Sequence, residues 1–285
     1  FVGSNLALRL AKRGDNVVGI IRDSRLVTPF KLLGLENKVS VVYGDITDQK
    51  LIERVIMDYK VDTIFHLAAN TLVANAQRAP AQAIRNNILG TLSVLEAARV
   101  CGKVERFLCQ QTDKVYGPQK SPQTEDLPLL ADEPYSGSKA CNDILARIYY
   151  STYNLPIVST RPCNLYGPGD IQSRVIPNTI RTCLKNRSPI IFKKDDKREF
   201  LFIDDFIDAL IFLVENIERT KYQVYNVGSD TIENNEGVVL EILKLFPSLK
   251  PVYVETGTGI REIPEQWPDY SKLRKLGWEP KVSFE

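Results

Sequence analysis

Short apolar segments alternate with helical segments along the first 160 residues of the chain. The apolar segments occupy 16–21, 39–43, 62–67, 106–109 and 157–160. Between them, apolar residues recur with helical spacing at 3–13, 51–59, 81–100 and 135–153. Strands that are apolar on both faces and are separated by helices are typical of a parallel sheet covered on both sides. We therefore predict an α/β fold built on a doubly wound parallel sheet.

The alternation becomes irregular after residue 161, where Pro and Gly divide the chain into shorter elements. A helix at 205–216 and a strand at 224–227 are still predicted to rejoin the sheet. We expect a smaller α/β lobe over the carboxyl ends of the strands, where ligands of open parallel sheets bind. The predicted larger lobe is 1–165 with 200–230, and the smaller one is 166–199 with 231–285. Because the chain starts in a helix pattern, we also expect that a first strand and a short C-terminal tail are missing.

The composition narrows the possible partners. The chain is 44% hydrophobic and 25% charged, with a net charge of +2, so we expect neither nucleic acid nor a membrane as a partner. No apolar run approaches the roughly 20 residues that span a bilayer. The single histidine, His66, ends a predicted strand and is interpreted as a packed imidazole. The cysteines lack paired spacing and lie mostly in apolar stretches, which favours reduced core thiols in a cytoplasmic protein: Cys101, Cys109, Cys141, Cys163 and Cys183.

Two groups of reactive side chains stand out. Tyr135 and Lys139 are four residues apart in a predicted helix, so they share one helix face. A phenol has an ordinary pKa of about 10, and a nearby ammonium stabilises the anion that takes a proton from an alcohol. Thr112, Asp113 and Lys114 follow the fourth apolar segment and add a hydroxyl, a carboxylate and an amine. A Tyr–Lys pair also occurs by chance on helix surfaces, and Asp113 with Lys114 also fits a solvated charge pair.

Residues at other strand ends indicate a dinucleotide site. Phe1-Val2-Gly3 leads into the first helix as the end of a glycine-rich phosphate turn does, although a packing glycine fits there too. Further candidates for this site are Asp45, Ile46, Leu67, Ala68, Ala69 and Asn87. Arg22 and Asp23 close the second strand, where a carboxylate suits the ribose of NAD and a guanidinium suits the 2′-phosphate of NADP. We expect NAD ahead of NADP.

The motifs resemble those of the extended short-chain dehydrogenase/reductase family, in its nucleotide-sugar epimerase and dehydratase branch. The resemblance covers the whole chain and rests on Phe1-Val2-Gly3, Gly44-Asp45, His66-Leu67-Ala68-Ala69, Thr112-Asp113-Lys114-Val115-Tyr116-Gly117, Tyr135 with Lys139, Arg161-Pro162, Asn164, Tyr166-Gly167, Arg198, Ile203-Asp204-Asp205, Tyr225-Asn226-Val227-Gly228 and Leu276-Gly277-Trp278. It implies a Rossmann-type fold in which the larger lobe binds NAD(P). It also implies catalytic roles for Thr112, Tyr135 and Lys139.

Within this branch, the residues after the threonine separate two reactions. Sugar 4,6-dehydratases carry Asp followed by Glu or Lys, whereas most 4-epimerases lack the acid. Thr112-Asp113-Lys114 resembles the Asp-Lys type found in CDP-glucose 4,6-dehydratases. The resemblance implies that Tyr135 takes the C4 hydroxyl proton of the sugar while hydride passes to NAD(P), that Lys114 takes the C5 proton, and that Asp113 protonates the leaving C6 hydroxyl. Two alternatives stay open: a 4-epimerase that uses Tyr135 and Lys139, and a non-catalytic dinucleotide-binding regulator.

The expected substrate is a nucleotide-diphosphate sugar. Its candidate ligands are Asn164, Arg174, Arg198 and Arg261. Guanidinium groups bind phosphate in a bidentate manner, so Arg198 is ranked first and Arg174 second. Each arginine also fits a plain surface charge.

The resemblance further implies a homodimer through the predicted helices 81–100 and 135–153. The apolar residues of these helices would equally suit the core of a monomer: Leu92, Leu95, Ile148 and Tyr149. We expect no metal site.

Overall fold

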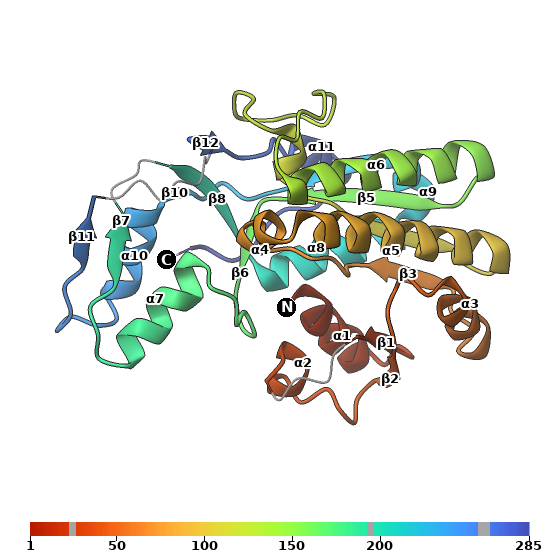
Figure 1. The fold of residues 1–285 in the computed structure, drawn as a ribbon, viewed down its shortest axis with the longest axis horizontal. Helices are drawn as coiled ribbons and strands as arrows, with labels where there is room; N and C mark the ends of the chain where they lie inside the picture. The colour runs from red at the N-terminus through yellow and green to blue at the C-terminus, as the bar shows by residue number, and fades with distance from the viewer. Residues whose placement is uncertain (23–26, 193–195, 256–262, 285) are drawn as a thin grey trace.

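The computed structural model describes residues 1–22, 27–192, 196–255 and 263–284 (Figure 1). Its parallel strands are β1 (Val18–Ile21), β2 (Ser40–Tyr43), β3 (Thr63–His66), β4 (Arg106–Gln110), β5 (Ile157–Pro162) and β9 (Gln223–Val227). Four of them form one sheet in the order β3-β4-β5-β9, and β1 pairs with β2 separately. The pairing of β5 with β9 confirms that the strand predicted at 224–227 rejoins the sheet.

Helices cover both faces of the four-stranded sheet, which explains why its strands are apolar throughout. On one face lie α3 (Gln49–Asp58), α5 (Pro80–Cys101) and α6 (Pro134–Tyr153), and on the other lie α1 (Val2–Arg13), α8 (Ile203–Glu215) and α11 (Ser271–Leu276). Successive side chains of β4 show this arrangement. Phe107 and Cys109 join the core beneath α5 and α6, whereas Leu108 joins the core beneath α8. As predicted, α5 and α6 lie side by side (Figure 1).

Shorter elements connect the larger ones. They are α2 (Pro29–Leu32), α4 (Val73–Arg78), the 3-10 helix η1 (Asp113–Tyr116) and α9 (Ile217–Thr220). Helix ends follow the local sequence. The α1 helix ends at Gly14, whose φ of 96° lies in the left-handed region that glycine adopts without strain.

A smaller lobe lies beside this body (Figure 1). It combines α7 (Val175–Leu184), α10 (Asn235–Leu243) and the parallel pair β7 (Ile190–Phe192) and β11 (Val252–Val254). A mixed sheet links the lobe to the body because one of its strands, β8, runs directly into α8. This sheet has the order β10-β8-β12, with β6 also paired to β8. Its strands are β6 (Asn164–Tyr166), β8 (Lys197–Phe202), β10 (Ile232–Asn234) and β12 (Glu265–Gln266).

The cysteines are free, and most of them are at least partly buried. All five cysteines are free thiols, as predicted. Cys109, Cys163 and Cys183 are buried, but Cys141 is exposed, because its position on α6 faces away from the sheet. Among the helices in the described ranges, none is long and apolar enough to cross a membrane.

Candidate active site

The loop after β4 presents the Thr112-Asp113-Lys114 segment at the carboxyl end of the sheet. Thr112 caps η1, and its hydroxyl accepts a hydrogen bond of 3.4 Å from the Lys114 N–H. The 3-10 turn ends at Gly117, which has a φ of +66°. A Cβ atom on Gly117 would lie 2.0 Å from the carbonyl oxygen of Leu130. Only glycine therefore fits at position 117, where the backbone passes so close to the Leu130 carbonyl group.

A buried polar network supports this loop from below. The Tyr116 hydroxyl donates to Asn226 Oδ1 at 2.7 Å and accepts from Arg161 Nη1 at 2.9 Å. Arg161 Nε also donates to Asp143 Oδ2 at 2.7 Å. The Asn226 amide donates in turn to the Gln123 carbonyl. These hydrogen bonds fix the loop against β5, β9 and α6.

Tyr135 stands at the start of α6, next to this loop. Pro134 occupies the first helical position, and Glu133 caps the helix by accepting from the Tyr135 N–H at 2.9 Å. Burial raises the pKa of the Tyr135 phenol to about 12, while a hydrogen bond from Thr112 lowers it and the charge of Asp113 raises it. These interactions show that Thr112, Asp113 and Tyr135 lie together, as the sequence predicts.

Asp113 is almost completely buried beside Tyr135. Burial raises the pKa of its carboxyl group, although Lys114, Thr112 and Arg198 act in the opposite direction. Within the described part of the chain, Asp113 Oδ2 is buried without a hydrogen-bond partner. This oxygen is therefore available to a group bound beside Tyr135. A protonated Asp113 is able to donate to such a group.

Lys114 and Gln266 form the far side of this cluster. Lys114 is partly buried, and its Nζ donates to Gln266 Oε1 at 3.4 Å. Gln266 Nε2 donates to the Asp113 carbonyl oxygen at 3.2 Å. Gln266 is not predicted from the sequence, because nothing in its local sequence shows that β12 pairs with β8 and thereby reaches this loop.

Lys139 is buried in α6, one turn after Tyr135. Its ammonium donates to the Gln110 carbonyl oxygen at 2.6 Å, at the end of β4. Burial lowers the pKa of Lys139 to about 8. A buried ammonium needs an acceptor, and the strand-end carbonyl supplies it.

The start of α1 and the end of β3 meet where a dinucleotide would bind. The first backbone N–H groups of α1 have no side-chain cap. A Cβ atom on Gly3 would lie 3.9 Å from Leu67 Cδ1, so the strand end lies directly against the helix start. Uncapped N–H groups beside the carboxyl ends of parallel strands suit a pyrophosphate. These residues therefore fit NAD. Ala68 and Ala69 continue the chain from this point.

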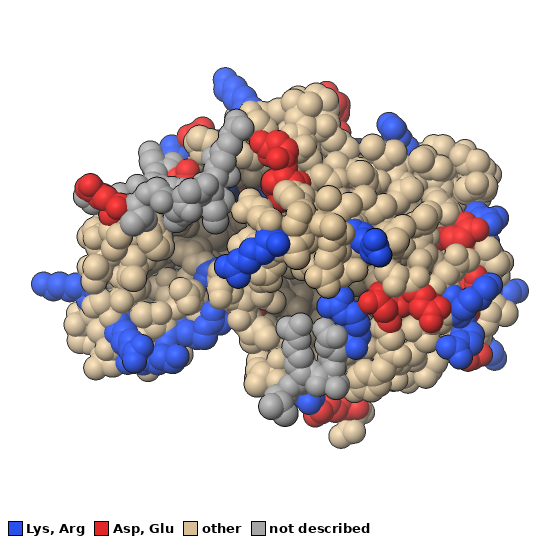
Figure 2. All heavy atoms as spheres, in the orientation of Figure 1, with Lys and Arg blue, Asp and Glu red and all other residues tan. Residues whose placement is uncertain are grey.

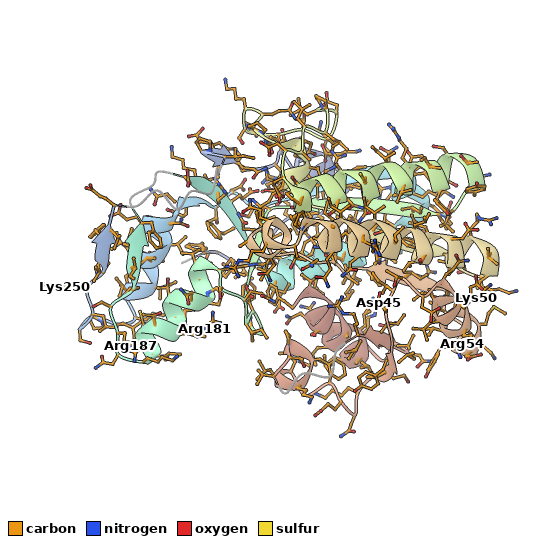
Figure 3. All side chains as sticks on the ribbon, in the orientation of Figure 1. Asp45, Lys50, Arg54, Arg181, Arg187 and Lys250 are labelled. Atoms are coloured by element: carbon orange, nitrogen blue, oxygen red, sulfur yellow. The ribbon has the colours of Figure 1, made fainter. Side chains whose placement is uncertain are left out.

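The residues predicted for the adenine end of the site lie after β1 and β2. Asp45 follows β2 and accepts from both the N–H and the hydroxyl of Thr47 at 2.9 Å. Ile46 packs against α5, where a Cβ atom on Gly90 would lie 2.4 Å from Ile46 Cδ1. Arg22 is exposed just after β1, and Asp23 lies outside the described residues. Asp45 lies on the larger body, across the molecule from the basic side chains labelled on the smaller lobe (Figure 3).

Asn87 joins two parts of the predicted site. Its Oδ1 accepts from the Asn70 N–H at 2.7 Å, and its Nδ2 donates to the Ser138 hydroxyl at 2.8 Å. It thereby ties the segment after β3 to the helix that holds Tyr135.

His66 is a packed imidazole, as interpreted from the sequence, with Nε2 2.8 Å from the Thr91 hydroxyl. Burial lowers the pKa of His66 to about 3, so it is neutral.

The candidate substrate ligands lie at the border between the two lobes. Asn164 Nδ2 donates to the Glu199 carbonyl oxygen at 3.3 Å, which links β6 to β8. Arg174 precedes α7, lies 3.7 Å from Asp170 Oδ2, and its charge lowers the pKa of Tyr135. Arg198 lies on β8, where its charge acts on Asp113. Arg261 lies outside the described residues. Figure 2 shows a recess between the lobes that Lys and Arg side chains border.

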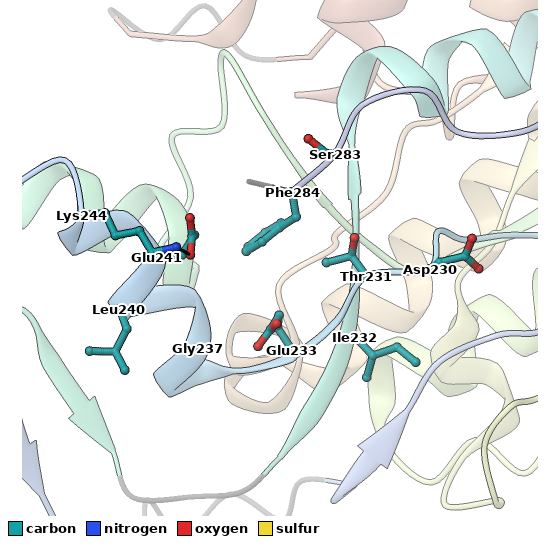
Figure 4. Close-up of a pocket in the computed structure, with 10 residues that line it drawn as sticks. All are labelled: Asp230, Thr231, Ile232, Glu233, Gly237, Leu240, Glu241, Lys244, Ser283 and Phe284. Carbon is teal, nitrogen blue, oxygen red and sulfur yellow. Dashed lines mark ion pairs between the residues drawn. The ribbon is translucent and has the colours of Figure 1, made fainter.

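A separate pocket lies within the smaller lobe, between β10, α10 and the segment at Ser283 and Phe284 (Figure 4). Its ionisable lining residues are Asp230, Glu233, Glu241 and Lys244. Three carboxylates against one ammonium repel a diphosphate. None of the predicted site residues within the described ranges lines this pocket, so it is not the predicted site.

Comparisons with known proteins agree with this geometry. The model of the NAD dependent epimerase/dehydratase family matches residues 1–228. A dTDP-glucose 4,6-dehydratase of Xanthomonas campestris is 31% identical and covers 100% of this chain and 87% of its own length. The solved dTDP-glucose 4,6-dehydratase of Streptomyces venezuelae, with NAD bound, has a TM-score of 0.86 at 27% identity and covers 100% of this chain and 90% of its own.

A solved UDP-glucuronic acid 4-epimerase of Bacillus cereus, in complex with UDP-glucuronic acid and NAD, has a TM-score of 0.88 at 25% identity. It covers 99% of this chain and 92% of its own. These likenesses confirm the predicted Rossmann-type α/β fold and NAD as the cofactor of the family. The chain belongs to the NAD-dependent epimerase/dehydratase family of enzymes.

Proposed function

We propose that this enzyme is a nucleotide-sugar 4,6-dehydratase, which converts an NDP-hexose into an NDP-4-keto-6-deoxyhexose. The observation that supports it most strongly is the buried Asp113 beside Tyr135, with one carboxylate oxygen left unpaired. A dehydratase needs an acid to protonate a departing hydroxyl. A 4-epimerase removes no water and has no use for an acid at this place.

Tyr135, Lys114 and Asp113 would each carry out one proton transfer of the reaction. Tyr135, as its anion, takes the proton of the C4 hydroxyl. Burial raises the phenol pKa to about 12, and the Thr112 hydrogen bond and the Arg174 charge act against that rise. Oxidation at C4 acidifies the C5–H bond. The amine of Lys114 takes the C5 proton, while Asp113 gives its proton to the C6 hydroxyl, which leaves as water. Burial favours the protonated form of Asp113 that this step needs.

NAD, when bound, supplies the hydride acceptor and donor that the reaction needs. The residues that would hold it are Gly3, Arg22, Asp45, Ile46, Leu67, Ala68, Ala69, Asn87, Tyr135 and Lys139. In this proposal, 1–165 with 200–230 bind the cofactor, and 166–199 with 231–285 bind the substrate. Asn164, Arg174 and Arg198 would hold the nucleotide-diphosphate sugar.

A substrate panel tests the function. The full-length protein is incubated with dTDP-, UDP-, CDP- and GDP-hexoses, and the products are analysed by mass spectrometry and NMR. A 4,6-dehydratase gives a product that has lost one water and gained a C6 methyl group. A product of unchanged mass with inverted C4 identifies a 4-epimerase instead. A protein that binds NAD but alters no sugar would be the non-catalytic regulator.

We also propose a homodimer through α5 and α6. Leu92, Leu95 and Tyr149 belong to the core of the monomer, but other apolar side chains of these helices are 39–45% exposed: Ile84, Leu89, Ile144 and Ile148. Analytical ultracentrifugation tests the dimer, since a monomer at micromolar concentration contradicts it. Free thiols support a reducing, cytoplasmic location, and the product class fits polysaccharide biosynthesis.

A further inference from the structure

Gln266 is a buried amide that bridges the two residues proposed as acid and base. Its exposed fraction is 0%, although it belongs to the two-residue strand β12 near the end of the chain. Pairing with β8 places Gln266 opposite Arg198 and turns its side chain toward the loop after β4. There it makes the contacts of 3.2 Å to the Asp113 carbonyl oxygen and 3.4 Å to Lys114 Nζ.

The direction of the Gln266 amide is fixed by its partners. The carbonyl oxygen of Asp113 only accepts hydrogen bonds, so Gln266 must present its NH2 group to it. Its Oε1 atom therefore faces residue 114. An oxygen at this position suits a lysine, which donates N–H groups in both its charged and its neutral form. It would repel a glutamate there.

The contact also restricts the amine. One N–H of Lys114 is held by Gln266 Oε1, and the backbone of Asp113 is held by the other end of the same amide. A lysine side chain is otherwise long and has many rotamers. The amide thus keeps the amine of Lys114 in a constant position relative to the backbone of Asp113.

We propose that Gln266 is a positioning residue for the elimination step, matched to lysine at position 114. It acts through Lys114 and Asp113 and does not touch the reacting atoms. The inference rests on the proposed dehydratase function and adds a residue from the smaller lobe to it. It implies that C4 oxidation depends little on Gln266, whereas removal of the C5 proton and of water depends strongly on it.

Two variants test the proposal. Gln266→Leu removes both contacts at similar size, and Gln266→Glu retains an oxygen beside Lys114 but adds a negative charge. Single-turnover formation of reduced nicotinamide reports C4 oxidation, and loss of water together with C5 exchange in D2O reports elimination. We expect Gln266→Leu to keep C4 oxidation within about 2-fold of the wild type and to slow elimination by about 10- to 100-fold, as misplacement of reacting groups does.

The Gln266→Glu variant supplies a readout that a merely structural residue would not change. Its carboxylate stabilises the ammonium form of Lys114, so the pH–rate profile of elimination should move to higher pH and the rate should recover in alkali. Gln223→Leu is the matched control, because Gln223 Oε1 accepts from Lys272 at 3.0 Å elsewhere on the surface. Equal losses of oxidation and elimination in Gln266→Leu, or unchanged elimination, would overturn the proposal.

A chemical readout separates this proposal from the proposed function. Acetic anhydride modifies free lysine amines, and mass spectrometry of the peptide that holds Lys114 gives its rate. We expect this rate to rise in Gln266→Leu and to stay at the wild-type value in Gln223→Leu. An unchanged rate in Gln266→Leu overturns the positioning contact. A raised rate, in an enzyme whose wild type only inverts C4, overturns the dehydratase function and leaves the contact standing.

Discussion

The carboxyl group of Glu199 stays protonated at neutral pH because it is buried, close to the carboxyl group of Asp113. Burial raises the pKa of Glu199 to about 9, and Asp113, when it is ionised, adds to the rise. The Ser229 N–H donates to Glu199 Oε1 at 2.8 Å. A Cβ atom on Gly228 would lie 2.4 Å from Glu199 Oε2, so the carboxyl group is tightly enclosed. Burial in this enclosure disfavours the charged form of Glu199.

Glu199→Gln is expected to stabilise the protein increasingly as pH rises. The pKa of Glu199 is about 9 in the folded protein against an ordinary value of 4.5, so the unfolded chain loses this proton first and wild-type stability falls across that window. An amide cannot ionise, so the gain should grow by on the order of 1 kcal/mol per pH unit. Urea unfolding at several pH values measures it. Glu105→Gln, with a side chain 69% exposed, should follow the wild type. A wild-type pH slope in Glu199→Gln contradicts the burial argument.

Asp113→Asn should separate the two halves of the reaction. The amide cannot donate the proton that the C6 hydroxyl needs, but it leaves Tyr135 in place. We expect C4 oxidation near the wild-type rate and a loss of elimination of about 10²- to 10⁴-fold. Reduced nicotinamide should then accumulate when substrate is added, and its absorbance measures the amount. Asp132→Asn, at an exposed position before α6, is the control. Elimination at full rate in Asp113→Asn would rule out the acid role.

Tyr135→Phe should abolish C4 oxidation itself. Without the phenol, no group removes the C4 hydroxyl proton, and we expect the rate of oxidation to fall by about 10²- to 10⁴-fold. Stopped-flow measurement of reduced nicotinamide follows this step. Tyr153→Phe is the matched control, because Tyr153 lies on the same helix and is 50% exposed. Oxidation that continues unchanged in Tyr135→Phe would mean that another base serves C4.

Two glycine substitutions should have opposite effects on stability. Gly117→Ala combines a positive φ with a carbonyl oxygen 2.0 Å from the new Cβ atom, so it should cost more than the roughly 1–3 kcal/mol of such backbone strain and inactivate the enzyme. Gly137→Ala lies within α6, where nothing stands within 4 Å of the new Cβ atom. It should stabilise the protein by about 0.5–1 kcal/mol. Thermal unfolding of both variants checks the sign of each change.

The sheet and its long helices were predictable because both faces of β4 and β5 are covered. Full coverage makes a strand apolar throughout, and that pattern is visible in the sequence without knowledge of its neighbours. The start of the helix at Pro134 is likewise indicated by a local feature of the sequence, the N-cap residue Glu133. These elements depend on residues that are close together in the chain.

The mixed sheet, and the contacts of its side chains, could not be predicted from residues close together in the chain. The β12 strand has only two residues, and it becomes a strand through its pairing with β8. For the same reason Gln266 could not be connected with Asp113 from the sequence. The Lys139 contact with the Gln110 carbonyl depends on which acceptor lies nearest in space, and helical spacing does not give that information.

The attachment of β12 to β8 has a consequence for exchange of segments between relatives. A chimera that takes residues 231–285 from a relative would keep the loop after β4 of this chain, yet it would bring a foreign side chain against the lysine of that loop. Recombination within this group of proteins should therefore succeed only where both distant pieces are inherited together.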